Sequence, residues 1–374
     1  MPDPAAAPTP PVDAATLRRA RRMPKVLLHE HLDGGLRVAT LLDLLRQRGI
    51  APPAEDADTL AAWFDARAHA GSLDEYLRGF ALTVAAMATP QALARVAFEA
   101  AEDARAEGCV LAEFRIAPLL FEPYGIAPDA AVQALLDGLS RSPLPSGLIV
   151  CALRHEPDAQ IARAAALALR WHRAPERAGR PGRPGAARVV GFDLAGPEAG
   201  FPATRHAALL GELRAAGLGL TLHAGEADAG QRVLEAARLG AQRIGHGVRL
   251  AELIDAPGGA AVLAELQRLD VHLEVCPTSN LHTGAAASLA LHPIHALWRA
   301  GVHLSFHTDN RLISRIDHST EAARLLQAGF GWDALLRMGL DAAAASFLPE
   351  PARQAARSAL LDWAAAEGLA PAAR

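Results

Sequence analysis

The stretch that decides the fold is Pro24-Lys25-Val26-Leu27-Leu28-His29-Glu30-His31-Leu32-Asp33-Gly34-Gly35. A short apolar run is followed by two histidines one residue apart and then by a break at glycines. Because side chains alternate in direction along a β-strand, His29 and His31 are predicted to project to one face and Glu30 to the other. Two imidazoles on one face at a strand end can bind a single metal ion, although the pattern also suits a histidine-bearing strand end at a surface turn.

The composition describes a globular chain with enough apolar mass for a large core. Of the 374 residues, 51% are hydrophobic and 21% are charged, which is compatible with one barrel-sized domain. A net charge of -4 argues against nucleic acid or an anionic membrane as a partner. Three widely separated cysteines, the lack of an apolar run of membrane length and the lack of a signal-like N-terminus predict a reduced, cytoplasmic protein.

Two regions are expected along the chain. Residues 1–22 form an extension that is Ala/Pro-rich and disordered at first and then basic and helical through Leu17-Arg22. Residues 23–374 form a single domain. The oligomeric state cannot be read from the sequence.

Within that domain, strand-like and helix-like segments alternate. After the strand that ends at His31, seven further strand candidates are 110–116, 148–153, 189–194, 218–223, 243–247, 271–276 and 302–307. A long helical region, about 55 to 107, contains no strand pattern. We therefore predict an α/β fold of the (β/α)8 TIM-barrel type, with a helical insertion after strand 1 and extra helices at the C-terminus. A doubly wound open sheet is the competing architecture, but no Gly-x-Gly-x-x-Gly turn follows the first strand.

The barrel prediction implies that polar residues gather where the strands end, because active sites of this fold lie at the carboxyl ends of the strands. Such residues follow six of the eight candidates. The segments are His29-Glu30-His31, Asp193-Leu194-Ala195-Gly196, His223-Ala224-Gly225-Glu226, Gly245-His246-Gly247, Cys276-Pro277-Thr278-Ser279-Asn280 and Thr308-Asp309-Asn310. Packing alone does not explain histidines or carboxylates at the ends of strands one, five, six and eight.

Three histidines and a carboxylate form a sound zinc ligand set that leaves a position for water. The predicted ligands are His29, His31, His223 and Asp309. A hydrolytic zinc lowers the pKa of its water toward neutrality. Glu226, three residues after a predicted ligand, could shuttle a proton to the substrate, and His246 between two glycines could orient the hydroxide.

Two other metal-dependent designs fit the sequence less well. A binuclear site bridged by a carbamylated lysine needs a lysine on strand four, whereas Lys25 is the only lysine in the chain and begins the first strand. The zinc deaminase design with His-x-Glu and Pro-Cys-x-x-Cys is absent, because Cys276 precedes a proline and has no partner cysteine.

Taken in order, these segments resemble the adenosine deaminase family of the amidohydrolase superfamily. The motifs are His-x-His-Leu-Asp-Gly, Asp-Leu-Ala-Gly, His-Ala-Gly-Glu, Gly-His-Gly, Cys-Pro-Thr-Ser-Asn and Thr-Asp-Asn. The resemblance extends from about Pro24 to the C-terminal helices. His-Ala-Gly-Glu followed by Gly-His-Gly at this spacing is specific, and the variants around His31 and Asn310 resemble the bacterial branch.

The resemblance implies a purine-metabolising hydrolase that converts adenosine or 2'-deoxyadenosine to inosine or 2'-deoxyinosine and ammonia, with one zinc ion per chain. Glu226 would protonate N1 of the purine, His246 would hold the hydroxide, and Asp309 would also take a proton from the zinc-bound water. The residues implied to contact the substrate are His31, Asp33 at the ribose 5'-hydroxyl, Gly196 at N3, Asn310 at N7, and an apolar lid of Leu73, Tyr76, Leu77 and Phe80. The lid spacing equally suits one buried helix face.

Asn310 is a departure, because many members carry a second aspartate there. An amide donates to the N7 acceptor without first being protonated, so we expect the N7 contact to depend less on pH. The change leaves other 6-aminopurines open as substrates, including adenine and aminodeoxyfutalosine. A carboxylate at Asp33 would repel a 5'-phosphate, which disfavours AMP. A non-catalytic purine-binding relative is the alternative from another class, but such a protein should have lost a ligand or the proton shuttle.

Overall fold

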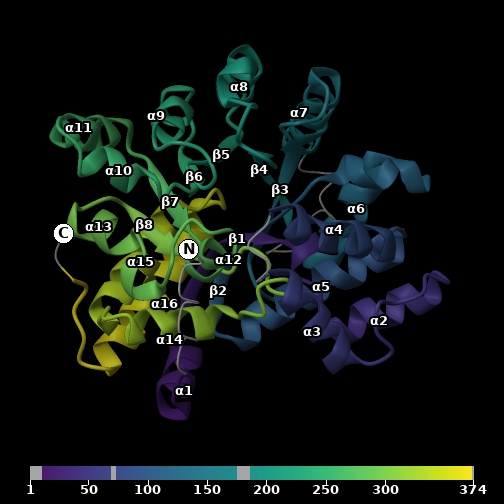
Figure 1. Ribbon diagram of the computed structural model, residues 1–374, viewed down its shortest axis with the longest axis horizontal. Helices are drawn as coiled ribbons and strands as arrows, with labels where there is room; N and C mark the ends of the chain where they lie inside the picture. The colour runs from purple at the N-terminus through teal and green to yellow at the C-terminus, as the bar shows by residue number, and fades with distance from the viewer. Residues whose placement is uncertain (1–10, 69–72, 175–185, 373–374) are drawn as a thin grey trace, which may run out of the picture.

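The computed structural model describes residues 11–68, 73–174 and 186–372, with side chains described except at 73–78. Eight parallel strands form one sheet in the order of the chain, from β1 to β8. Figure 1 shows them gathered in the middle of the molecule with helices around them. Their bounds are β1 Lys25–His31, β2 Cys109–Ile116, β3 Ser146–Leu153, β4 Arg188–Ala195, β5 Gly219–Ala224, β6 Arg243–His246, β7 His272–Val275 and β8 Leu304–Phe306.

The sheet closes on itself where β1 meets the residues after β8. The amide of His31 donates to the carbonyl of Asp309 at 2.8 Å, and the amide of Asp309 donates to the carbonyl of His29 at 3.0 Å. This parallel bridge joins the first and last strands at their carboxyl ends. The predicted (β/α)8 barrel is therefore confirmed, and all eight strand candidates coincide with strands.

Helices cover the outside of the barrel. Four described helices separate β1 from β2: α2 Val38–Gln47, α3 Ala57–Ala68, α4 Leu73–Met87 and α5 Pro90–Ala106. The other helices are α1 Ala14–Arg22, α6 Pro128–Leu139, α7 Asp158–His172, α8 Ala207–Ala215, α9 Gln231–Arg238, α10 Leu250–Ile254, α11 Gly259–Leu269, α12 Pro277–His282, α13 Ile294–Arg299, α14 His318–Gln327, α15 Trp332–Ala345 and α16 Glu350–Ala366. Short 3-10 turns are η1 Leu32–Gly34, η2 Pro118–Tyr124, η4 Ala203–His206 and η5 Leu289–Leu291.

Two apolar clusters hold these elements together. The larger one lies between the strands and the surrounding helices. The smaller one joins Val26 and Leu28 of β1 to Leu336 and Leu340 of α15 and Leu360 of α16. These residues come from the beginning of β1, so the smaller cluster seals the amino end of the barrel and leaves the carboxyl end for the site.

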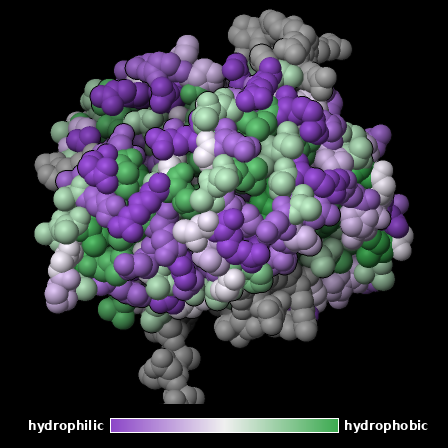
Figure 2. All heavy atoms as spheres, turned by 90° about the horizontal axis from the view of Figure 1, so that it is seen from above, coloured by the Kyte–Doolittle hydropathy of each residue, from purple (hydrophilic) through white to green (hydrophobic). Residues whose placement is uncertain are grey.

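Over the face drawn in Figure 2, hydrophilic and hydrophobic residues are interspersed. Among the described residues, no single helix is long and apolar enough to cross a membrane. One pair of consecutive helices, Gly79–Met87 and Pro90–Ala106, passes that test together by length and composition but is bent by 115°.

Candidate active site

The carboxyl ends of β1 and β8 bring two histidines to one aspartate. The Nε2 atoms of His29 and His31 lie 3.4 Å and 3.5 Å from Oδ1 of Asp309. Glu30 between them accepts hydrogen bonds from Thr308 and Arg311 instead. The alternation of side chains along β1 thus separates the two histidines from the glutamate in the way the sequence suggests.

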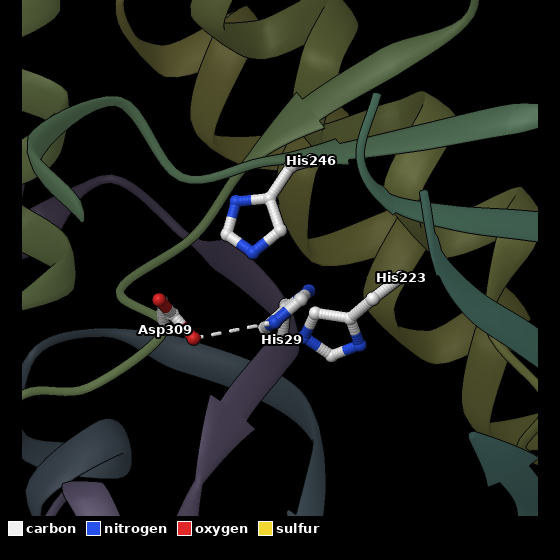
Figure 3. Close-up of side chains that lie close together, drawn as sticks. All are labelled: His29, His223, His246 and Asp309. Carbon is white, nitrogen blue, oxygen red and sulfur yellow. Dashed lines mark ion pairs between the residues drawn. The ribbon is translucent and has the colours of Figure 1, made fainter. Parts of the chain in front are cut away.

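Two more histidines come from the ends of β5 and β6. One ligand atom each of His29, His223, His246 and Asp309 lies within 4.8 Å of the others (Figure 3). His31 lies beside this group, since its Nε2 is 3.4 Å from Nε2 of His223. The structure therefore brings the four predicted ligands close together, and it also places His246 in a group with three of them.

Carboxylates behind two of these rings determine which nitrogen faces the group. Nδ1 of His29 is 2.9 Å from Oε2 of Glu274, and Nδ1 of His223 is 3.0 Å from Oδ1 of Asp193. An imidazole that donates from Nδ1 to a carboxylate directs the lone pair of Nε2 the other way, as in carboxylate–histidine–metal arrangements. Nε2 of His29 is buried and has no hydrogen-bond partner within the described chain.

Burial keeps two of the imidazoles neutral. Burial lowers the pKa of His29 and holds that of His31 well below its usual value. Burial would also lower the pKa of His223, but the charge of Asp193 and its hydrogen bond outweigh this and raise it. Burial opposes the ionised form of Asp309, yet its neighbours His29, His246 and His31 hold its pKa well below the usual value. Neutral imidazoles around a carboxylate are the form that binds a metal cation.

Glu226 lies on the loop after β5, beside this group. Its Oε2 is 3.4 Å from Nε2 of His246, and its Oε1 accepts a hydrogen bond of 3.0 Å from Thr283. Burial raises the pKa of Glu226, and the charges of Asp309 and Glu198 act in the same direction. A partly buried carboxyl group with a raised pKa is suited to proton transfer near neutral pH.

Glu198 holds the Glu226 loop in place. Its carboxylate accepts hydrogen bonds from the backbone amides of Gly225, Glu226 and Asp228 at 3.0, 3.1 and 3.2 Å. Three charge-assisted bonds to one buried carboxylate fix the loop more firmly than neutral bonds would.

The backbone is strained at two of the site residues. His246 and Asp309 adopt left-handed conformations, with φ of 63° and 58°, which residues other than glycine rarely adopt. Gly245 also permits the crowding of rings, because a Cβ there would lie 3.0 Å from Cε1 of His29 and 3.3 Å from Cγ of His223. Such strain is typical of functional positions.

A pocket opens above the group. Its lining includes His31, Asp33, Gly196, Glu226 and Asn310, together with Phe80, His223, His246 and Asp309. None of the described residues that line it is a lysine or arginine. Burial raises the pKa of Asp33 to about 7.

The predicted substrate contacts can be placed only in part. Asp33, Gly196, Asn310 and Phe80 all line the pocket, and their contacts to a substrate stay predictions. Leu73, Tyr76 and Leu77 belong to the start of α4, but their side chains lie outside the described residues, so the lid stays a prediction.

Sequence reasoning missed the support beneath the site. Arg115 lies inside the barrel, 2.8 Å from Asp193 and 2.6 Å from Glu274, and so bridges the two carboxylates that hold His29 and His223. Charged residues inside otherwise apolar strands, as in Glu113-Phe114-Arg115-Ile116 and Leu273-Glu274-Val275, were the available signal. Because buried charges need partners, such residues indicate a polar barrel interior.

The chain is similar to known deaminases over most of its length. The family model described as "Adenosine deaminase" matches residues 24–363. An adenosine deaminase of Mycobacterium tuberculosis is 42% identical over 353 residues, covering 90% of this chain and 93% of the relative. One of Mycobacterium avium is 42% identical over 355 residues, covering 89% and 93%.

Solved structures share the fold at lower identity. A zinc-bound amidohydrolase of Burkholderia ambifaria has a TM-score of 0.80 at 22% identity, covering 97% of this chain and 98% of its own. An adenine deaminase of Arthrobacter aurescens has a TM-score of 0.76 at 24% identity, covering 92% and 99%. The structure of an ADAL–IMP complex has a TM-score of 0.77 at 23% identity, covering 94% and 99%.

Proposed function

The chain belongs to the adenosine deaminase family, and we propose that it is a zinc-dependent hydrolase that converts adenosine and 2'-deoxyadenosine to inosine and 2'-deoxyinosine with release of ammonia. The observation that carries this proposal is the position of Glu226. A partly buried carboxyl group with a raised pKa lines the same pocket as a group of histidines and an aspartate that suits a metal.

The residues fit one zinc ion. His29, His31, His223 and Asp309 would hold it, because three neutral imidazole nitrogens and one carboxylate oxygen are a ligand set that zinc accepts. The buried Nε2 of His29, which lacks a hydrogen-bond partner within the described chain, supports this fit. The amidohydrolase of Burkholderia ambifaria, which shares the fold, holds zinc. When bound, zinc would supply hydroxide at neutral pH by lowering the pKa of water.

The chain's own residues would handle the protons and the purine. Glu226 would donate a proton to N1, which makes C6 more electrophilic, and Asp309 would accept a proton from the attacking water. His246 would orient the attacking oxygen on one face of the ring. The Gly196 amide would donate to N3, the Asn310 side-chain amide to N7, and Asp33 would hydrogen-bond the ribose 5'-hydroxyl.

The charge of the pocket favours a nucleoside over a nucleotide. Asp33, Glu226 and Asp309 are acidic, and the described lining contains no lysine or arginine to pair with a phosphate. A 5'-phosphate would have to be desolvated beside carboxylates, which is costly. The ADAL structure contains a nucleotide, IMP. At 23% sequence identity to this chain, however, that structure supports only a shared fold and not a shared substrate.

Adenine and aminodeoxyfutalosine are the alternative substrates, since Asn310 replaces an aspartate that many members carry. An adenine deaminase shares this fold, so fold alone does not select the nucleoside. A non-catalytic purine-binding protein is disfavoured, because the four proposed metal ligands and Glu226 are all present and adjacent.

Ammonia release from adenosine, adenine and aminodeoxyfutalosine by the zinc-loaded protein tests this proposal. We expect turnover of adenosine that a chelator abolishes and added zinc restores. Faster turnover of adenine or aminodeoxyfutalosine than of adenosine would support the proposed deamination but would contradict the proposed substrate. Binding of zinc without turnover of any of the three would contradict the enzymatic proposal.

A further inference from the structure

The Cys276-Pro277-Thr278-Ser279-Asn280 segment has no role in the chemistry above, yet it contacts two groups of the site. It forms the start of α12, directly after β7, and buries Ser279 and Asn280. The Ser279 hydroxyl donates to Oδ2 of Asp309 at 2.6 Å, and Nδ2 of Asn280 lies 3.0 Å from Nδ1 of His246. One helical turn thus contacts both Asp309 and His246.

A chain of hydrogen bonds reaches Asn280 from the next helix. The backbone amide of Ile294, at the start of α13, donates to Nδ1 of His292 at 3.0 Å. A backbone N–H can only donate, so Nδ1 of His292 is an acceptor. His292 is buried, and burial lowers its pKa to about 3. A neutral imidazole that accepts at Nδ1 carries its proton on Nε2.

The direction of each following bond is then determined. Nε2 of His292 lies 3.3 Å from Oδ1 of Asn280, so the imidazole donates and the amide oxygen accepts. The other end of the same amide is its NH2 group, which donates to Nδ1 of His246. His246 therefore accepts at Nδ1, and in its neutral form its proton is on Nε2.

We propose that His292 and Asn280 are positioning residues that hold His246 as the Nε2–H tautomer, through the chain Ile294–His292–Asn280–His246. The opposite tautomer would require the Asn280 amide to turn round, which would place its NH2 group against the N–H of His292. Asn280 is fully buried, so the two facing donors would be left unsatisfied.

This tautomer gives His246 a different role from the histidines proposed as metal ligands. Its Nε2 presents a hydrogen to the pocket, on the side where Oε2 of Glu226 lies 3.4 Å away. A nitrogen that carries a proton has no lone pair for a metal, so His246 is not a ligand although it belongs to the compact group of four. Under the proposed function, on which this step rests, His246 donates a hydrogen bond to the attacking oxygen and does not remove its proton.

The test is a pair of variants of equal size, His292→Gln and His292→Glu, in the zinc-loaded enzyme. Glutamine can donate to Asn280 as His292 does, whereas a glutamate carboxylate can only accept and turns the amide round. Ring-¹⁵N histidine spectra report which nitrogen of His246 carries the proton, with the His246 signal identified by its loss in His246→Gln.

We expect Nε2–H at His246 in the wild type and in His292→Gln, with kcat within about fivefold of each other. In His292→Glu we expect Nδ1–H at His246, a kcat lower by about 10²- to 10⁴-fold and a KM within about threefold, as for other enzymes with the wrong histidine tautomer. If the buried glutamate prevents folding, Asn280→Asp makes the same change, because its carboxylate cannot donate to His246.

An unprotonated Nε2 at His246 in the wild type would overturn the inference, as would an equal loss of kcat in both His292 variants. The nitrogen spectrum does not depend on turnover. A wild type with Nε2–H but no deaminase activity would thus contradict the proposed function and leave the tautomer assignment standing.

Discussion

The two ends of the barrel interior differ in how their buried charged side chains are paired. Toward the amino end, Arg243 lies 2.7 Å from Glu113 and 2.5 Å from Glu274, and Arg115 also pairs with Glu274. At the carboxyl end, imidazoles and the acidic Asp309 and Glu226 face one another, and no described lysine or arginine lines the pocket. The arginines of the chain itself compensate the first set, whereas the second would be completed by the proposed metal cation and substrate.

The two ends differ because solvent and ligands can reach only the carboxyl end of the barrel. The amino end is sealed by the apolar cluster of β1, α15 and α16, so charges there need partners from within the fold. The carboxyl end opens into the pocket, so ligands can enter from solvent. Acidic groups that no described lysine or arginine pairs with therefore mark the proposed functional end of the barrel, and carboxylates paired with arginine mark the sealed end.

The largest expected effect is at the open end, in Glu226→Gln. A glutamine keeps the size of the side chain but cannot supply a proton, so we expect kcat to fall by about 10²- to 10⁴-fold. Steady-state kinetics on adenosine measures this. Thr283→Val, which removes only the hydrogen bond to Oε1, is the matched control and should lose less than about tenfold. Equal losses in the two variants would argue against a proton-transfer role.

At the sealed end, we expect Arg243→Met to lower the free energy of unfolding by about 3–5 kcal/mol, because it leaves Glu113 and Glu274 buried without this partner. Urea titration measures the change. Arg353→Met, in the more exposed Arg353–Glu350 pair, should lower the free energy of unfolding by less than about 1 kcal/mol. A cost below about 1 kcal/mol at Arg243 would mean that the interior pairs are not needed for stability.

Lys25, also at the sealed end, should make stability depend on pH. Its ammonium donates to the carbonyls of Ala20 and Met23, and burial lowers its pKa to about 8. The folded state thus binds fewer protons than the unfolded state between about pH 8 and the ordinary lysine pKa of 10.5. Stability should therefore rise with pH across that window, by up to about 3 kcal/mol at about 1.4 kcal/mol per pKa unit.

Unfolding by urea from pH 7 to 10.5, in the wild type and in Lys25→Met, isolates this contribution. Lys25 is the only lysine, so no other lysine titrates there. The difference between the two proteins should grow with pH in favour of the wild type. A constant difference would show that the pKa of Lys25 is not lowered by folding.

The smallest effect we predict concerns the carboxylates that join the two ends. Asp193→Asn weakens the partner of both His223 and Arg115, so we expect zinc affinity to fall by about 10- to 100-fold. Competition with a chelating dye measures it. Ser346→Ala, which removes a hydroxyl bonded to Glu113 at the sealed end, should leave zinc affinity unchanged. An equal fall in zinc affinity in both variants would contradict the distinction between a metal-binding end and a structural end of the barrel.

Much of the site was predictable because its residues follow the strands directly. In a parallel barrel every strand ends at the same rim, so His29, His31, His223, His246 and Asp309 had to meet once the eight strands were recognised. The roles of these residues stay predictions, as do those of the lid positions Leu73, Tyr76 and Leu77. The chain from His292 to His246 was not predictable, because it depends on how α12 and α13 pack after β7 and on the direction of single hydrogen bonds.

The sequence by itself determined the barrel, the rim at which the chemistry lies and the side chains available to bind a metal, because strand periodicity and the order of motifs are local properties of the chain. Only the tertiary structure decided which nitrogen of each imidazole faces the site. That choice depends on partners distant in sequence, such as Glu274 behind His29 and Asn280 behind His246, and a hydrogen bond has a direction only when both of its groups are in place.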